Sequence, residues 1–176
     1  MDGSGCGLKK PLHAQDRDSE ANLARRREFL EALRRISPER LIYLDESGVT
    51  TSMMRLRGRC RGGRRIHEAT PGGHWKIMTI PSAMSLKGMI ATMTIEEPAG
   101  SGIFLAHVEH VLWPVLEPGH VVVMDNLSSH KSGAVSGLIE RQGAGVLYLP
   151  AYSPDQNPLE KAWSKLEQLL RSTKAR

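Results

Sequence analysis

Three short runs of apolar residues constrain most strongly how this chain can fold. Each run is four residues long and lacks the alternation of apolar and polar residues that a half-exposed strand shows. Such runs are typical of strands covered on both faces of a sheet. They occupy residues 41–44, 121–124 and 146–149. Helical apolar periodicity follows the second and third runs, over residues 131–142 and 158–170. Because alternating strands and helices imply parallel pairing, this part of the chain predicts parallel strands packed between helices.

The earlier part of the chain favours an antiparallel meander. Residues 74–85 and 88–96 predict two more strands that turn at residues 85–88 and lie antiparallel to the first apolar run. A helix over residues 103–116 follows, and Pro114 should kink or shorten it because proline lacks a backbone N–H. We therefore predict an α/β fold with a mixed sheet, in which an antiparallel meander is followed by parallel strands and helices flank both faces.

A separate helix precedes this sheet. Residues 1–17 are polar and contain glycine, and we expect them to be poorly ordered. An amphipathic pattern runs from Ser19 to Ile36 and predicts a helix that ends at Pro38. We assign residues 18–40 to this connector helix and residues 41–176 to the main domain.

Charge and composition narrow the class of partner. The 176 residues carry a formal net charge of +5, and their 40% hydrophobic and 24% charged content is ordinary for a soluble globular protein. No apolar run approaches the roughly 18 residues that cross a membrane, and residues 1–10 lack the apolar core of a signal peptide. Two cysteines are too few for a disulfide framework. We expect a cytoplasmic protein with a polyanionic partner and no membrane contact.

Three carboxylates occupy positions that suit a metal site. Asp45 and Asp125 follow the first and second apolar runs, and functional groups collect at the carboxyl ends of parallel strands. Glu160 lies in the first turn of a helix that Asn157 should cap and Pro158 should begin. Taken singly, each aspartate is explained by a structural role in a turn, and Asn157 and Glu160 are explained by a capping box at the start of the helix. Together, three clustered carboxylates favour a pair of Mg²⁺ or Mn²⁺ ions, which relieve their repulsion and support phosphodiester chemistry.

An arginine-rich segment predicts contact with a nucleic-acid backbone. Six arginines and no acidic residue occur within residues 55–65. Arginine contacts with phosphate give sequence-independent affinity that falls with salt, and we favour this role over a solvated loop because such loops usually mix in acidic residues. The arginines are Arg55, Arg57, Arg59, Arg61, Arg64 and Arg65.

Two other groups of residues are weaker candidates. Residues 25–27 are three arginines on the connector helix, for which a solvated helix face is favoured over DNA contact. His107 and His110 have the spacing of two metal ligands on a helix. Without a third partner, an exposed helix face is the favoured interpretation for both histidines.

Three motifs of the chain resemble those of a known family. Asp45-Glu46-Ser47-Gly48 and the segments at residues 125–131 and 149–163 look like the DDE transposases of the mariner superfamily, in its bacterial insertion-sequence branch. Between Asp125 and Glu160 lie 34 residues, which is the spacing of that family. The resemblance implies a ribonuclease-H-like fold and two-metal cleavage of DNA at transposon ends, followed by strand transfer into a TA target.

The resemblance also assigns roles to residues. Asp45, Asp125 and Glu160 match the metal-binding catalytic triad. His130 and Lys131 belong to the second motif and are candidates for DNA binding, although His130 also suits a role in bracing its loop. DNA is the implied partner, a homodimer is compatible with the family, and a bacterial, nucleoid-associated location in the cytoplasm is expected.

The resemblance fails at both ends, which leaves a second function open. The N-terminal helix-turn-helix modules of such transposases are not visible, and the chain stops soon after the helix of Glu160, so we expect a copy truncated at both ends. A non-catalytic DNA-binding remnant is therefore the alternative to an active transposase domain. An aspartate-phosphorylating enzyme is disfavoured, because Ser47 stands where such enzymes usually place a second aspartate.

Overall fold

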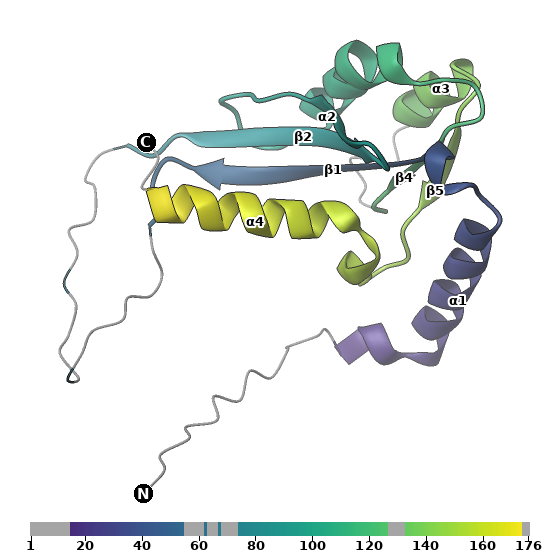
Figure 1. The fold of residues 1–176 in the computed structure, drawn as a ribbon, viewed down its shortest axis with the longest axis horizontal. Helices are drawn as coiled ribbons and strands as arrows, with labels where there is room; N and C mark the ends of the chain where they lie inside the picture. The colour runs from purple at the N-terminus through teal and green to yellow at the C-terminus, as the bar shows by residue number, and fades with distance from the viewer. Residues whose placement is uncertain (1–14, 55–61, 63–66, 68–73, 127–132, 174–176) are drawn as a thin grey trace, which may run out of the picture.

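A single mixed sheet forms the centre of the protein. The computed structural model describes residues 15–54, 62, 67, 74–126 and 133–173. Within them, five strands pair in the order β3-β2-β1-β4-β5 (Figure 1). β1 pairs antiparallel with β2 and parallel with β4, and β5 continues the parallel side. The predicted mixed sheet is confirmed. The strands are β1 Leu41–Thr50, β2 Ile77–Ser85, β3 Gly88–Thr92, β4 Val121–Met124 and β5 Gly145–Tyr148.

Helices cover both faces of the sheet. The α-helices are α1 Glu20–Arg34, α2 Ser101–His107, α3 Gly133–Arg141 and α4 Pro158–Thr173. Figure 1 shows α2 and α3 on one side of the sheet and α1 and α4 on the other. α2 continues as a π-helical turn, η4 Val108–Leu112, and a 3-10 turn, η5 Trp113–Val115. The helix predicted over residues 103–116 is therefore α-helical only in its first part. Its last turn, which contains Pro114, is the tighter 3-10 form because proline lacks a backbone donor.

Two hydrophobic cores lie on opposite faces of the sheet. Ile42 and Leu44 of β1 join the larger core with Phe104 of the α2 segment, whereas Leu41 and Tyr43 pack into a smaller core. The smaller core is built around Phe29 of α1, Val123 and Leu149. Because successive strand residues point to opposite faces, a run without polar residues supplies both cores at once.

β1 is longer than the apolar run predicts. It extends to Thr50 because β2 pairs with residues 43–50, beyond the point where β4 ends. In this second half, Asp45, Ser47 and Val49 are buried and alternate with more exposed neighbours. Asp45 therefore lies in the middle of a strand, not at its end. Of the two strands that pair with β1, only the parallel strand β4 ends beside Asp45.

His107 is a core residue, so its predicted exposure is wrong. Its side chain is fully buried, because it lies on the same helix face as Phe104 and Val108. The ring atom Nε2 lies 3.4 Å from the carbonyl oxygen of Ala91 in β3, and Nδ1 has no partner within the described residues. Burial lowers the pKa of His107 below its usual value. His110, in contrast, is exposed as predicted.

The N-terminal region is only partly described. Residues 1–14 of the segment predicted to be poorly ordered lie outside the described residues. The next residues form a 3-10 turn, η1 Gln15–Asp18, in which Arg17 pairs with Asp155 at 3.3 Å. A second 3-10 turn, η2 Pro38–Arg40, links α1 to β1. None of the described helices combines the length and apolarity that a bilayer crossing requires.

The buried histidine predicts an acid-sensitive fold. With its lowered pKa, His107 stays neutral in the folded chain, whereas the unfolded chain takes up the proton near pH 6.5. Its stabilising contribution is present above that pH and is lost as the pH falls toward the folded-state pKa. Chemical denaturation from pH 7.5 to 5 should show that the native chain loses on the order of 1 kcal/mol more unfolding free energy than His107→Leu. His110→Leu is the matched control and should keep the native pH dependence.

Candidate active site

The parallel pairing of β1 and β4 places two aspartates side by side. Leu44 is in register with Met124 in this ladder, so Asp45 and Asp125 are the next residues on neighbouring strands. Asp45 is buried and Asp125 is half-buried. Asp45 lies just past the last residue of β1 that pairs with β4, at the carboxyl end of the parallel ladder, where polar functional groups collect in open sheets.

The third carboxylate reaches the same place from α4. The backbone N–H of Leu149 donates to the carbonyl oxygen of Met124 at 2.8 Å, so the loop after β5 leaves the sheet beside Asp125. That loop leads through a 3-10 turn, η6 Pro154–Gln156, into α4, whose first turn carries Glu160. A cavity of about 370 Å³ results, and the three predicted carboxylates line it together. Its other lining residues are Asn126, Asn157 and residues 149–154.

Asn157 caps α4 and also bonds to Asp45. Its Oδ1 accepts from the N–H of Leu159 at 3.1 Å, and its Nδ2 donates to Asp45 Oδ2 at 2.8 Å. Its own N–H donates to the carbonyl of Pro154 at 3.0 Å. A capping box would use that N–H to bind the Glu160 side chain. The cap is therefore complete without Glu160, whose exposed side chain borders the cavity.

Trp163 makes a contact with Asp45 that the sequence did not predict. Its apolar spacing predicted packing alone, yet its indole Nε1 donates to Asp45 Oδ2 at 3.2 Å. Tryptophan is common on the buried face of any amphipathic helix, so its position carries no local sign of this bond. Asp45 thus accepts hydrogen bonds from Asn157, which precedes α4, and from Trp163 within it, and a third, at 2.8 Å to Oδ1, from the N–H of Glu46.

The environment of Asp45 raises its pKa to about 6. Burial is the largest cause, because it disfavours the charged form. The negative charges of Glu160 and Asp125 add to the rise, whereas the hydrogen bonds from the Glu46 backbone and the Trp163 indole oppose it. Asp45 therefore lies within electrostatic reach of the other two carboxylates, and with a pKa of about 6 it is largely ionised at neutral pH.

The donor set fits a divalent cation, although the side chains are not gathered around one position. Among the described residues, no three acidic, histidine or cysteine side chains are placed to hold a metal ion. Carboxylate oxygens are the ligands that Mg²⁺ and Mn²⁺ prefer, and a cation would offset both the burial of the Asp45 charge and its repulsion by Glu160 and Asp125. Asp45 Oδ2 already accepts two hydrogen bonds and Oδ1 only one, so Oδ1 keeps a lone pair for an ion.

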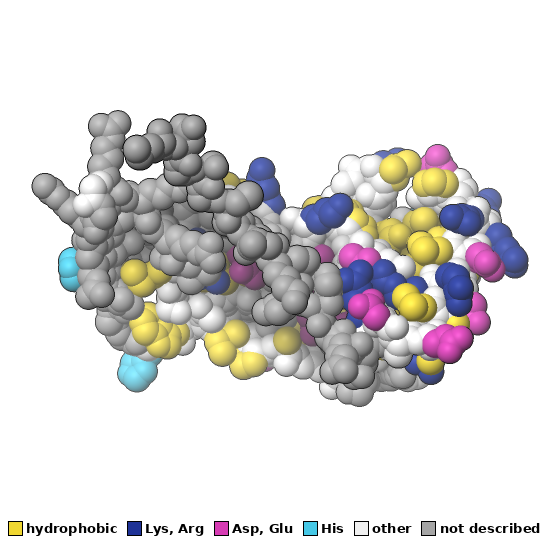
Figure 2. All heavy atoms as spheres, turned by 90° about the horizontal axis from the view of Figure 1, so that it is seen from below, with side chains coloured by type: hydrophobic (Ala, Val, Ile, Leu, Met, Phe, Trp, Pro, Cys, Tyr) yellow, Lys and Arg dark blue, Asp and Glu magenta, His cyan; other side chains and the backbone are white. Residues whose placement is uncertain are grey.

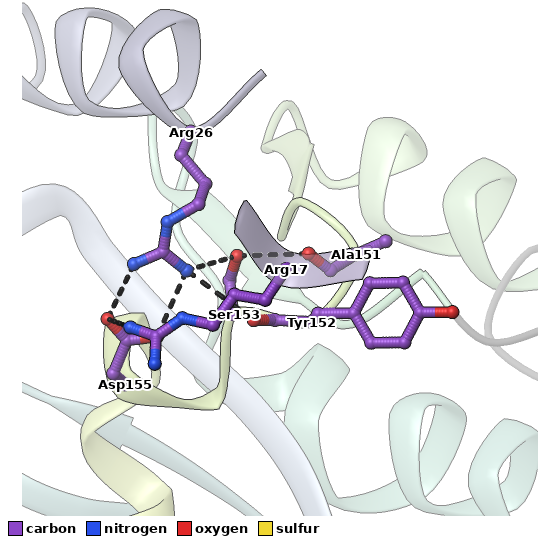
Figure 3. Close-up of polar contacts among 6 residues, drawn as sticks. All are labelled: Arg17, Arg26, Ala151, Tyr152, Ser153 and Asp155. Carbon is purple, nitrogen blue, oxygen red and sulfur yellow. Dashed lines mark hydrogen bonds and ion pairs between the residues drawn. The ribbon is translucent and has the colours of Figure 1, made fainter. Parts of the chain in front are cut away.

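An ion-pair cluster fixes the cavity loop from outside (Figure 3). Arg26 of α1 binds Asp155 in a bidentate manner, with N–O distances of 2.6 and 3.0 Å. The Arg26 guanidinium also donates to Ser153 Oγ at 2.7 Å and to the carbonyl oxygen of Tyr152 at 3.5 Å. Arg17 adds a contact of 3.3 Å to Asp155. The hydrogen bond from Arg26 lowers the pKa of Asp155.

The interpretation of residues 25–27 as a solvated helix face is wrong for Arg26, which binds the cavity loop. Successive helix residues point about 100° apart, so one of the three arginines turns toward the 152–155 loop. Arg25 and Arg27 are exposed, and Arg25 contacts Asn22 at 3.4 Å. Figure 2 shows basic and acidic side chains intermixed over the end of the molecule that holds α1, as expected of a solvated surface.

The residues predicted to bind DNA lie outside the described part of the chain. They are Arg55, Arg57, Arg59, Arg61, Arg64, Arg65, His130 and Lys131. Their role stays a prediction.

Comparison with known proteins identifies the family. A model of the DDE superfamily endonucleases matches residues 40–176, which include all three carboxylates. The chain therefore belongs to the DDE superfamily of endonucleases. A segment of 55 residues is 38% identical to the transposable element Tcb1 transposase of Caenorhabditis briggsae, covering 31% of this chain and 20% of that protein.

Solved structures share the fold. The Mos1 strand transfer complex matches with a TM-score of 0.72 and 20% identity, over 95% of this chain and 53% of the Mos1 chain. The mariner Mos1 paired end complex with Mg matches with a TM-score of 0.69 and 20% identity, over 97% and 54% of the two chains. The predicted ribonuclease-H-like fold is confirmed. The chain spans about half the length of these Mos1 chains.

The Arg26 cluster predicts a specific loss of stability. Arg26→Ala should lower the unfolding free energy by about 1 kcal/mol, because a bidentate, charge-assisted contact is lost while half-exposed Asp155 regains water. Thermal and denaturant unfolding measure the change. Arg27→Ala removes an exposed neighbour of the same type and should change stability by less than about 0.5 kcal/mol. Equal losses in both variants would contradict a role for the cluster.

The indole bond predicts the titration of Asp45. Trp163→Phe removes a donor that stabilises the ionised carboxylate, so the pKa of Asp45 should rise above its value of about 6. Carbon-detected NMR of the Asp45 carboxyl group measures this directly. Trp113→Phe, at a partly exposed site in η5, is the control and should leave the titration unchanged. An unchanged or lowered pKa in Trp163→Phe would show that the indole does not act on this group.

Proposed function

We propose that this chain is the catalytic domain of a transposase, which cleaves DNA at transposon ends and joins the freed 3′-hydroxyl to a TA target. The observation that carries the proposal is the meeting of Asp45, Asp125 and Glu160 at one cavity in a member of the DDE endonuclease superfamily. Those residues come from two neighbouring strands and a distant helix. A shared role in binding the reacting phosphate explains that convergence.

The three carboxylates would hold two Mg²⁺ or Mn²⁺ ions. When bound, such ions activate the attacking oxygen and stabilise the leaving oxygen of a phosphodiester. The likeness to Mos1 complexes solved with Mg and with Mn supports this choice of metal. The protein's own part is to hold Asp45 in one orientation, through Asn157 and Trp163, and to keep Glu160 at the rim of the cavity.

Finer assignments follow from the motifs and the charge. The net charge of +5 and the arginines of residues 55–65 support DNA as the partner, held by Arg side chains together with His130 and Lys131. The likeness to mariner Mos1 and to Tcb1 supports the mariner superfamily. The bacterial insertion-sequence branch, a homodimer and a nucleoid-associated location are part of the same proposal and rest on the motifs alone.

A non-catalytic DNA-binding protein is the second candidate function. It is favoured by one observation, that the described acidic side chains are not placed to hold a metal ion. Such a protein would keep salt-sensitive affinity for DNA without turnover. The two candidates differ in one measurable property, which is metal-dependent cleavage.

Cleavage assays separate the candidates. The chain should nick plasmid DNA in the presence of Mg²⁺ or Mn²⁺ and not with chelator present. Loss of a residue that only supports a metal ligand typically costs a metal site about 10- to 100-fold. Asp125→Ala removes a proposed ligand itself, so it should reduce the nicking rate by more than that. Glu140→Gln alters an exposed acid of α3 and is the matched control, with unchanged nicking expected.

The outcomes of this assay are distinct. Nicking without metal, or nicking that survives Asp125→Ala, would reject the proposed mechanism. Salt-sensitive DNA binding without nicking by the unaltered chain would favour the second candidate.

A further inference from the structure

Tyr152 combines backbone strain with an exposed aromatic ring at the rim of the carboxylate cavity. Among the described residues it is the one non-glycine residue with a positive φ, at 57°. Its residue surface is 49% exposed, and it lines the same cavity as Asp45, Asp125 and Glu160. Left-handed backbone is costly for a bulky residue and free of strain for glycine. A turn that needed only this conformation would be better served by glycine, so the tyrosine ring itself requires an explanation.

The strained conformation is held on both sides of Tyr152. Arg26 contacts the Tyr152 carbonyl oxygen and Ser153 Oγ, and Ser153 Oγ in turn donates to the carbonyl oxygen of Ala151 at 3.2 Å. Asp155 anchors the guanidinium that makes these contacts. Figure 3 shows the ring of Tyr152 pointing away from this cluster. The cluster therefore fixes the backbone and leaves the ring to project from the cavity rim.

A second cavity adjoins the first beside this loop. Its volume is about 530 Å³, and it lies between α1 and β5. Both cavities are lined by Asn126 and by residues 149–151, the segment that leads directly to Tyr152. Apolar and aromatic side chains contribute to the second cavity, including Phe29, Leu147 and Tyr148. The charged residues Arg25 and Glu28 line it as well. A base next to a phosphate in the first cavity would thus have room beside both apolar and polar walls.

We propose that Tyr152 is a DNA-contacting residue, whose ring stacks on an unpaired base next to the phosphate held at the carboxylate cavity. The inference rests on the proposed function for the position of that phosphate. Aromatic rings bind unpaired bases through stacking that tolerates any sequence, because every base has a π-face. A base outside the duplex exposes that face, whereas a paired base inside the stack does not. Tyr152 would therefore select distorted or single-stranded DNA at the cut site.

A fluorescence experiment tests the stacking. The probe is a short duplex with an unpaired 3′ overhang that contains 2-aminopurine, whose fluorescence falls when it stacks on an aromatic ring. Binding is measured with Ca²⁺, which takes the same carboxylate ligands as Mg²⁺ and so offsets their repulsion of the phosphate, and the readout is fluorescence, so that no cleavage is needed. The unaltered 176-residue chain should quench the probe, and Tyr152→Ala should abolish that quenching and weaken overhang binding by about 10- to 100-fold. A blunt duplex should be bound equally by both.

Two further variants separate stacking from a structural role. Tyr152→Phe keeps the ring and should keep the quenching. Tyr152→Gly removes both the ring and the backbone strain, so it should lose the quenching while its melting temperature is unchanged or raised. A merely structural tyrosine would instead lower the melting temperature when replaced. Trp113→Ala changes a partly exposed aromatic residue in η5 and is the control, with native quenching expected.

The outcomes distinguish this inference from the proposed function. Quenching that depends on Tyr152, in a chain that does not nick DNA, would reject the nuclease function and keep the stacking role. Nicking by the unaltered chain, with overhang binding and quenching retained in Tyr152→Ala and Tyr152→Gly, would overturn the stacking role alone. Failure of the unaltered chain to bind the overhang probe would overturn it as well.

Discussion

The buried carboxylate of Asp45 joins the sheet to the helix that completes the site. A buried charge is costly unless hydrogen bonds satisfy it, and Asp45 receives them from its own strand and from Asn157 and Trp163 of the α4 region. These bonds fix the position of α4 along β1. Because Asn157 also caps α4, the side chain that begins the helix determines where Glu160 lies. The geometry of the site and the packing of the fold therefore depend on the same contacts.

The cavity loop is held at both ends, which explains how a strained residue persists there. Asn157 ties its C-terminal end to the central strand, and the pair of Arg26 with Asp155 ties its middle to α1. The bond from the Leu149 N–H to the Met124 carbonyl oxygen ties its N-terminal end to β4, and Tyr152 with its left-handed backbone lies between that bond and Asp155. Strain of this kind survives only where the surroundings fix the conformation. The arrangement also links α1, which precedes the sheet in the chain, to the loop that borders the three carboxylates.

Most of the fold was predictable, because its signals are local. The apolar runs of β1, β4 and β5 supply two cores at once, and the proline after Asn157 marks the first residue of α4. Prediction failed where burial depends on a distant neighbour. The polar half of β1 is a strand because β2 pairs with it, and His107 is buried because β3 lies against its helix. Neither partner can be read from residues nearby in the chain.

By itself, the sequence determined the order of strands and helices, the three acidic residues of the candidate site and the basic character of the protein. Each of these follows from periodicity, capping, motif spacing or charge within a short stretch of chain. Only the tertiary structure decided that Asn157 and Trp163 bind Asp45, across 112 and 118 positions, and that Arg26 holds Asp155. Such contacts arise when whole elements pack together, and no local pattern encodes which side chains then meet.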